Sequence, residues 1–294
     1  MVLSVFSMID SRYLLFVLSI EIMSIASLFR PLQPGIFDQH GRDISYVEMP
    51  PAPDLKEYIY CYWQLKTKTP LDQPYLYRVV SDGCIDILFE SCSINHIYIT
   101  GFSRSYIEYN LGSKFDYIGI RFLPTGFPLL FNLPASAFTN KFLNLAEYLP
   151  NIVEQIAQSI SVDQDLSEHK KAFNLCFLSC LEKSKSWISP DTRVFRAMDE
   201  ILKARGCIDI NALDVGLSQR QLRRLFQFYY GESPKTFCQI VRFQNILNSE
   251  LPNDDSTSNK LYYDLGYYDQ AHFIKEFKNF YGVTPSRAFG LWAP

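Results

Sequence analysis

The chain has 294 residues, of which 48% are hydrophobic, and it carries a formal net charge of −3. This length and apolar content suit two domains with substantial cores and exclude a mainly disordered protein. The segment from Asp191 to the end holds 13 Lys and Arg against 12 Asp and Glu, whereas the preceding part is acidic. A protein that coats DNA by charge alone is therefore excluded, and DNA binding must depend on a few well-placed cations.

Residues 1–45 contain an apolar run, Tyr13–Phe29, that is interrupted by one glutamate and three serines. The run is marginal in length for a membrane span, and its flank with Asp10 and Arg12 lacks the basic cluster of a signal peptide. Three interpretations stay open: an extra helix, a start codon assigned too early, or a membrane anchor. We expect nothing later in the chain to depend on this extension.

Short apolar runs rich in aromatic and β-branched residues occupy the chain from Tyr46 to about Phe138. Glycine-containing turns such as Asp82-Gly83 and Leu111-Gly112 separate them. This pattern predicts a compact β-rich domain, either a barrel or a sandwich. The runs are Tyr58–Leu65, Cys84–Phe89, His96–Thr100 and Tyr117–Phe122.

From Lys141 to Lys183 the apolar residues recur at helical spacing, with a polar break at Ser161–Lys171. This predicts two helices that pack on the β-rich domain or on each other in a homodimer. A polar linker is expected to follow. We therefore divide the chain into the extension (1–45), a β-rich domain with trailing helices (46–182), the linker (183–188) and an all-helical domain (189–294).

The seven cysteines are widely spaced and form no Cys-x-x-Cys pair, which favours buried free thiols in a reducing cytoplasm. Cys176 and Cys180 share one helical face with Phe173, so core packing is favoured over a metal or redox site. The four histidines are isolated, and we expect neither a metal nor a cofactor. The remaining cysteines are Cys61, Cys84, Cys92, Cys207 and Cys238.

The all-helical domain shows clear helix boundaries in its sequence. Ser189 is expected to cap a helix that Pro190 opens and Gly206 ends. Ser233-Pro234 opens a longer helix that runs to about Asn248.

Two stretches of this domain share one pattern: a short helix, a glycine turn, a small polar cap, and a helix with cations on one face. In the first, Gly216 can adopt the positive φ of the turn and Ser218 caps the helix that follows. In the second, Gly266 and Asp269 have the same roles. The inward residues are Leu222, Leu225 and Phe226 in the first stretch and Phe273, Phe277 and Phe280 in the second.

Four submotifs occur in order: Gly216-Leu-Ser-x-Arg-x-Leu-x-Arg-x-Phe, Gly231-Glu-Ser-Pro, Gly266-Tyr-Tyr-Asp-Gln-Ala-His-Phe and Gly282-Val-Thr-Pro. This series resembles the DNA-binding domain of the AraC/XylS family over about Pro190–Leu291. The resemblance implies two helix-turn-helix units joined by a long helix. Such a connector would place both reading helices on one side of double-stranded DNA, roughly one turn (~34 Å) apart.

The resemblance also implies which side chains contact DNA. Arginine can bond a guanine edge and glutamine an adenine edge, while lysine neutralises phosphates. Lys278 is expected on phosphate. A solvated helix face is the alternative for each arginine, and helix capping or packing is the alternative for His272. The expected contacts are Gln219, Arg220, Arg223, Arg224, Gln270, Ala271, His272, Lys275 and Lys278.

The sequence departs from the family pattern at two positions. Asn211 stands where an aliphatic residue is usual in the helix before Gly216, and it can shift or shorten that helix, with Ile210 and Leu213 taking over the packing. Tyr262 stands where the second unit usually has alanine, so the local core must enlarge.

Upstream, Tyr77–Phe89 and Gly119–Pro124 resemble the β-barrel sensor domains that precede some AraC-type domains. The expected fold is therefore α+β: a cupin-like barrel with trailing helices, then the all-α domain. Asp86 alternates with apolar neighbours, so it should pair with Arg78 or Arg121. A structural ion pair and a ligand contact both stay open for this group.

These observations predict a cytoplasmic, sequence-specific transcription regulator that a small-molecule effector or a partner controls. RNA polymerase and a second copy of the chain are further candidate partners. One alternative is a membrane-tethered regulator. The other is a cupin-type enzyme, which would need a histidine-rich metal set, although His96 is the only histidine between Tyr46 and Phe138.

Overall fold

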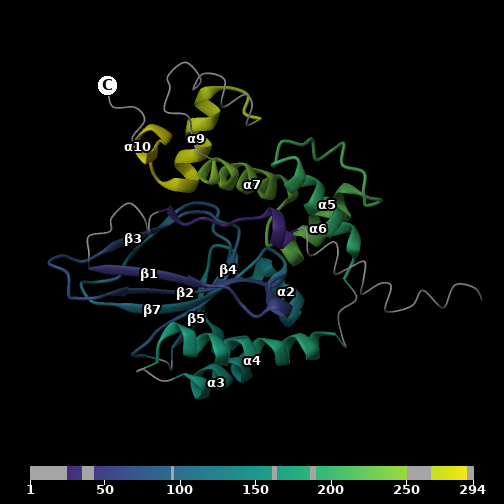
Figure 1. The fold of residues 1–294 in the computed structure, drawn as a ribbon. Helices are drawn as coiled ribbons and strands as arrows, with labels where there is room; N and C mark the ends of the chain where they lie inside the picture. The colour runs from purple at the N-terminus through teal and green to yellow at the C-terminus, as the bar shows by residue number, and fades with distance from the viewer. Residues whose placement is uncertain are drawn as a thin grey trace, which may run out of the picture.

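The computed structural model describes residues 25–34, 43–93, 96–160, 164–185, 190–249 and 266–289. In Figure 1 the β-sheet lies between one pair of helices, α3 and α4, and the C-terminal helices α5 to α10. The predicted cap at Ser189, the substitution at Tyr262 and residues 13–24 of the apolar run lie outside the described residues.

Eight described strands form two antiparallel sheets. The larger sheet has six strands in the order β1-β2-β7-β4-β5-β8, and β3 pairs with β6 in a separate two-stranded sheet. All four predicted runs are confirmed as β2, β4, β5 and β7. The strands are β1 (Ile44–Met49), β2 (Ile59–Thr67), β3 (Leu76–Val79), β4 (Ile85–Glu90), β5 (Ile97–Thr100), β6 (Ile107–Asn110), β7 (Asp116–Phe122) and β8 (Phe142–Asn144).

The predicted cupin-like barrel is wrong, because the larger sheet is open and β1 and β8 form its two edges in the described chain. Helices cover one face instead. Ile87 of β4 and Ile120 of β7 are fully buried there in one cluster with Phe173 and Phe177 of α4 (Leu166–Ser184). A sheet whose apolar face is covered by helices buries that face without closing into a barrel.

The helical region after Lys141 forms two helices, as predicted, namely α3 (Pro150–Ser159) and α4. Helix α4 extends through Ser184, which is 5% exposed, so the first two residues of the predicted linker are helical. A further helix, α2 (Gly126–Phe131), was not predicted.

All seven cysteines lie within the described residues, and no disulfide joins them. Cys176 and Cys180 pack in the core beneath the sheet, as predicted. The expectation of burial is wrong for Cys92 and Cys207, which are exposed.

The C-terminal domain is helical in its described part, with two corrections. The first helix begins at Thr192 rather than Pro190, and Asp191 is its N-cap. That helix ends at Lys203, and Gly206, with φ 75°, lies in the turn that follows; the predicted end of the longer helix at Asn248 is confirmed. The helices are α5 (Thr192–Lys203), α6 (Gln219–Tyr229), α7 (Pro234–Asn248), α9 (Gln270–Tyr281) and α10 (Pro285–Phe289).

No helix forms between Cys207 and Ser218, so the predicted short helix before Gly216 is wrong. The Asp209 carboxylate accepts a hydrogen bond from the Asn211 backbone N–H at 2.9 Å. The Asp209 backbone carbonyl accepts from the Ala212 N–H at 3.1 Å. Short polar side chains that bond nearby backbone groups in this way favour turns over helix. Leu213 is still buried and anchors the segment.

The two domains share one hydrophobic core. Phe29, Val80 and Phe102 pack in the same cluster as Phe237 and Ile240 of α7. The expectation that nothing depends on the N-terminal extension is therefore wrong for its last part, since Phe29 is 2% exposed in this shared core. No helix in the described ranges is long and apolar enough to cross a membrane.

Candidate nucleic-acid interface and effector cavity

Helix α6 presents its predicted cations at an ordered N-terminus. Ser218 and Gln221 form a reciprocal capping box there, and Gly216 turns the chain with φ 72°. Arg193 of α5 fixes this turn by donating to the Gly216 carbonyl at 2.8 Å while pairing with Asp191. No motif in the sequence predicted this role of Arg193.

The predicted contacts of α6 fall into two groups. Arg220, Arg223 and Arg224 are exposed on the face opposite the buried Leu222, which is where DNA contacts were expected. Gln219 is only partly exposed, and its amide donates to the Ile210 carbonyl at 2.9 Å. In this structure Gln219 supports the turn before the helix.

Helix α9 begins at the predicted cap, where the Asp269 carboxylate accepts from the His272 backbone N–H at 2.7 Å. Four of its five predicted contacts are exposed, and Gln270 is half-buried. The exposed residues are Ala271, His272, Lys275 and Lys278.

The His272 ring also has an internal neighbour that the sequence reasoning missed. Its Nε2 lies 3.9 Å from Oε2 of Glu276, a residue that is 6% exposed. The Gln239 side-chain amide donates to Oε2 of Glu276 at 2.6 Å. Arg242 Nη2 lies 3.5 Å from Glu276 Oε1, and the Arg242 guanidinium lies over the Tyr267 ring. This cluster joins α7 to α9. The i, i+4 spacing of His272 and Glu276 was the available signal.

A loop of the front domain, residues 101–106, contacts both the segment after α6 and helix α9. Arg104 donates from Nε to Glu232, just after α6, at 2.7 Å. Its carbonyl accepts from the Asn279 amide of α9 at 2.9 Å, and Tyr106 N–H donates to the Asn279 carbonyl at 3.1 Å. These contacts of the front domain therefore lie at the C-terminal ends of α6 and α9. The N-terminal ends of the two helices take no part in them.

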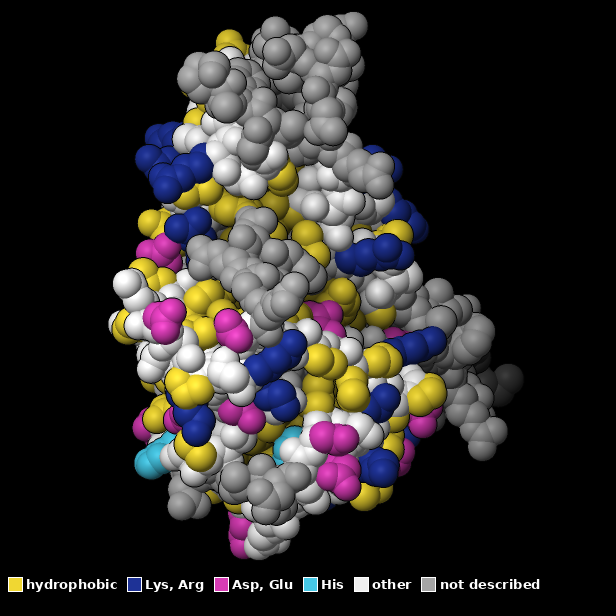
Figure 2. Space-filling view, turned by 60° about the vertical axis from the view of Figure 1, so that its left-hand side comes forward, with side chains coloured by type: hydrophobic (Ala, Val, Ile, Leu, Met, Phe, Trp, Pro, Cys, Tyr) yellow, Lys and Arg dark blue, Asp and Glu magenta, His cyan; other side chains and the backbone are white. Residues whose placement is uncertain are grey.

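A groove of about 640 Å³ runs between this loop, α7 and α9. Arg104 lines it together with His272, Lys275 and Lys278, so three predicted contacts of the second unit share one basic surface. Figure 2 is consistent with this distribution: on the face shown, most acidic side chains lie in the lower half, below the level of the C-terminal helices.

Two family models match the chain. Residues 212–289 match a helix-turn-helix domain, and residues 47–144 match a domain of unknown function, DUF6597. An uncharacterized HTH-type transcriptional regulator of Haemophilus influenzae is 34% identical over 71 residues. The C-terminal region is a helix-turn-helix domain. The chain spans only about a quarter (24%) of the length of that curated relative, and the alignment covers 24% of this chain.

Solved structures of ToxT from Vibrio cholerae also align with most of this chain in a comparison of backbone structures. One covers 85% of this chain and 98% of its own, at 13% identity and a TM-score of 0.37. Another, with an unsaturated fatty acid bound, covers 87% of this chain and 98% of its own, at 13% identity and a TM-score of 0.35. Similarity at this level supports no conclusion about what the present chain binds.

The front domain contains a buried ion pair at the predicted position. Asp86 of β4 faces Arg121 of β7 in register, and two hydrogen bonds of 3.2 and 2.9 Å join them. Of the two predicted partners, Arg121 is therefore the right one, and Arg78 pairs instead with Glu108. Burial raises the pKa of Asp86 to about 6, although Arg121 lowers it.

Trp63 of β2 completes this cluster from the neighbouring strand. Its indole Nε1 donates to Asp86 at 3.2 Å, and its ring lies over Gly119 of β7. A Cβ on Gly119 would lie 2.2 Å from the ring, so only glycine allows this placement. The Gly119–Pro124 sequence was recognised from the family resemblance, but this packing reason for its glycine was not.

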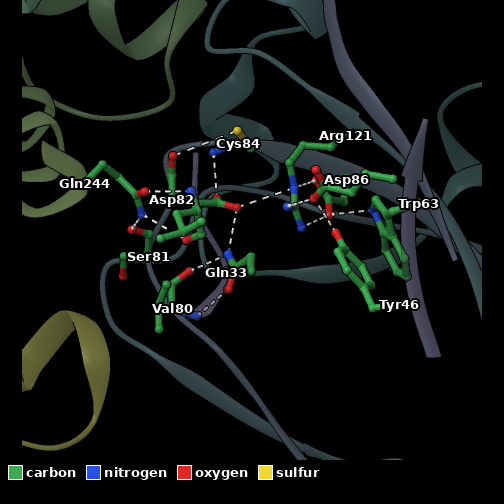
Figure 3. Close-up of polar contacts among 12 residues, drawn as sticks. Gln33, Tyr46, Trp63, Val80, Ser81, Asp82, Cys84, Asp86, Arg121 and Gln244 are labelled. Atoms are coloured by element: carbon green, nitrogen blue, oxygen red, sulfur yellow. Dashed lines mark hydrogen bonds and ion pairs between the residues drawn. The ribbon is translucent and has the colours of Figure 1, made fainter. Parts of the chain in front are cut away.

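A chain of polar contacts leads from this ion pair to the helix-turn-helix domain (Figure 3). Arg121 Nε lies 3.4 Å from Asp82, whose carboxylate accepts from the Gln33 amide at 2.7 Å. Gln33 also bonds both backbone groups of Val80. One residue further, the Ser81 carbonyl accepts at 3.0 Å from the amide of Gln244 on α7. Buried polar groups therefore connect the front domain to the helix between the two reading units.

Proposed function

We propose that this protein is a cytoplasmic, sequence-specific regulator of transcription that binds double-stranded DNA and is controlled by a ligand of its front domain. The observation that carries the proposal is the pair of capped helices, α6 and α9, which present exposed cations. The front-domain loop 101–106 holds both of them at their C-terminal ends. Side chains in the first turns of such helices can enter the major groove.

The proposed contacts follow from side-chain chemistry. Arg220, Arg223 and Arg224 read base edges, since arginine bonds guanine through two parallel hydrogen bonds. In the second unit, Gln270, Ala271, His272 and Lys275 face bases, and Lys278 neutralises a phosphate. Gln219 has a supporting role, because its amide is engaged by the Ile210 carbonyl.

Control by the front domain is proposed to act through the shared interface. Gln244 is 2% exposed and sits on α7, which connects the two units. A ligand that moves Asp82 or Arg121 would disturb the contacts that position α7 and thereby change how the reading helices meet DNA. Such coupling requires the ligand to bind the two arrangements with different affinity.

We also propose a homodimer formed through α3 and α4, and RNA polymerase as a partner of the DNA-bound protein. Leu175 on α4 is 73% exposed, which supports an apolar contact with a second copy. Sedimentation at micromolar concentration tests the dimer: a strict monomer contradicts it, and Leu175→Glu should dissociate a dimer.

Selection of the full-length chain on a randomised duplex pool at physiological salt tests DNA recognition. We expect enrichment of two short determinants about ten base pairs apart. Arg223→Ala should relax one position, whereas Lys171→Ala, an exposed substitution on α4, should leave the selected sequence unchanged. Salt-sensitive binding without enrichment would refute sequence-specific recognition.

A further inference from the structure

The front domain contains a cavity of about 130 Å³ beside the Asp86–Arg121 pair. Its walls come from the face of the large sheet opposite α3 and α4 and from the β3–β6 pair. The volume is close to that of an engineered protein cavity (about 150 Å³) that binds benzene. The apolar walls include Trp63, Tyr77, Leu88, Tyr109, Tyr117 and Phe142.

One end of the cavity is polar and carries excess negative charge. Asp82, Asp86 and Arg121 line it, and they are 9%, 8% and 3% exposed. No second Lys or Arg is present among the described residues that line the cavity. Two buried carboxylates therefore share one guanidinium.

Arg121 is surrounded by acidic groups on its remaining side as well. Its Nη1 has no hydrogen-bond acceptor within the described parts of the chain, and the Glu48 carboxylate lies 3.9 Å away. An anionic ligand at this end of the cavity would face three carboxylates and only one arginine. Buried charges in proteins are normally paired, so the missing partner of this end is a cation.

We propose that the cavity binds a compact organic cation, an amine with an aromatic or aliphatic body, whose ammonium group pairs with Asp82 and Asp86. The inference rests on the proposed function, because this ligand would be the effector. Three aromatic rings that line the cavity, those of Trp63, Tyr77 and Tyr109, suit the same charge, since ring faces attract desolvated cations. A hydroxyl oxygen on the same ligand would give Arg121 Nη1 its acceptor.

The ligand class can be tested by calorimetric titration of the full-length chain at neutral pH with three probes of similar shape. Phenethylamine is a cation, 2-phenylethanol is neutral and phenylacetate is an anion. We expect phenethylamine to bind at least about tenfold more tightly than the alcohol, and phenylacetate to bind most weakly. The proposal is overturned if phenylacetate or the alcohol binds as tightly as the amine, or if none of the three binds.

Variants locate the site. Asp86→Asn should reduce phenethylamine affinity about tenfold more than 2-phenylethanol affinity, because only the amine pairs with the lost charge. Tyr109→Leu should weaken amine binding, and Tyr109→Phe should restore it. Glu154→Gln, an exposed carboxylate change on α3, is the control that should alter nothing. Equal losses for the amine and the alcohol in Asp86→Asn would contradict the charge assignment.

Duplex binding measured on the same samples keeps the two proposals separate. A chain that selects a DNA sequence but ignores all three probes remains a regulator and loses this ligand class. A chain that binds phenethylamine through Asp86 but selects no DNA sequence retains the ligand class and loses the regulator function.

Discussion

The buried amide of Gln244 provides the sharpest test of how the two domains are joined. It accepts from the Leu32 N–H at 2.7 Å and donates to the Ser81 carbonyl at 3.0 Å. Leucine fills a similar volume but makes neither bond. Gln244→Leu would therefore leave the part-buried Leu32 N–H and the buried Ser81 carbonyl without these partners, at the junction of three chain segments.

An orphaned buried polar group costs about 1–3 kcal/mol, so the two orphaned groups should lower the free energy of unfolding by roughly 2–6 kcal/mol. Urea unfolding of the full-length protein measures this loss. Asn245→Leu is the matched control on the same helix, because the Asn245 amide bonds only the Val241 carbonyl one turn earlier, and it should cost less than about 1 kcal/mol.

A second readout separates stability from coupling. If the Gln244 contacts transmit the state of the cavity to α7, the variant should still bind phenethylamine but no longer change its duplex affinity when the amine is added. For the stability prediction, an unfolding free energy of Gln244→Leu within about 0.5 kcal/mol of the wild type would refute the reasoning. Buried hydrogen bonds that are fully formed cannot be lost at so low a cost.

The remaining predictions concern single side chains. Arg223→Ala should weaken cognate DNA by about 1–3 kcal/mol in a binding titration, whereas Lys278→Ala should weaken all duplexes alike and reduce the salt slope by about one. Gly119→Ala should displace the Trp63 ring, since the added Cβ would lie 2.2 Å from it, and an unchanged tryptophan emission spectrum would contradict this. Asp86 has a pKa raised by burial to about 6. Its folded pKa exceeds its unfolded one, so its contribution to stability is full below about pH 3.8 and is lost as the pH rises through 6. Unfolding free energies at pH 5 and 7 should show this fall in the wild type but not in Asp86→Asn.

Local rules in the sequence predicted much of the C-terminal domain. Ser218, Asp269 and Gly216 could be assigned because caps and positive-φ turns depend on a few neighbouring residues. The helix before Gly216 could not be assigned in the same way. It was predicted from the pattern that the two stretches share, and the Asp209 turn replaced it.

Features that depend on distant segments were beyond the sequence. The four apolar strands were recognisable, but an open sheet and a closed barrel bury the same alternating residues. The barrel would close only if the edge strands β1 and β8 paired. Whether they pair depends on what covers the sheet, which here is α4. The role of Arg104 was equally hidden, because its partners Glu232 and Asn279 lie more than a hundred residues away.

The spacing of the two reading helices follows from both domains rather than from α7 alone. A long connecting helix fixes the distance between its ends, but each reading helix can still tilt about its own junction. Arg104 contacts the segment after α6 through its side chain and α9 through its carbonyl. One loop therefore limits both tilts at once. Because that loop contains Gly101 and Ser103, which line the cavity, the same short segment touches the proposed ligand site and both DNA-reading units.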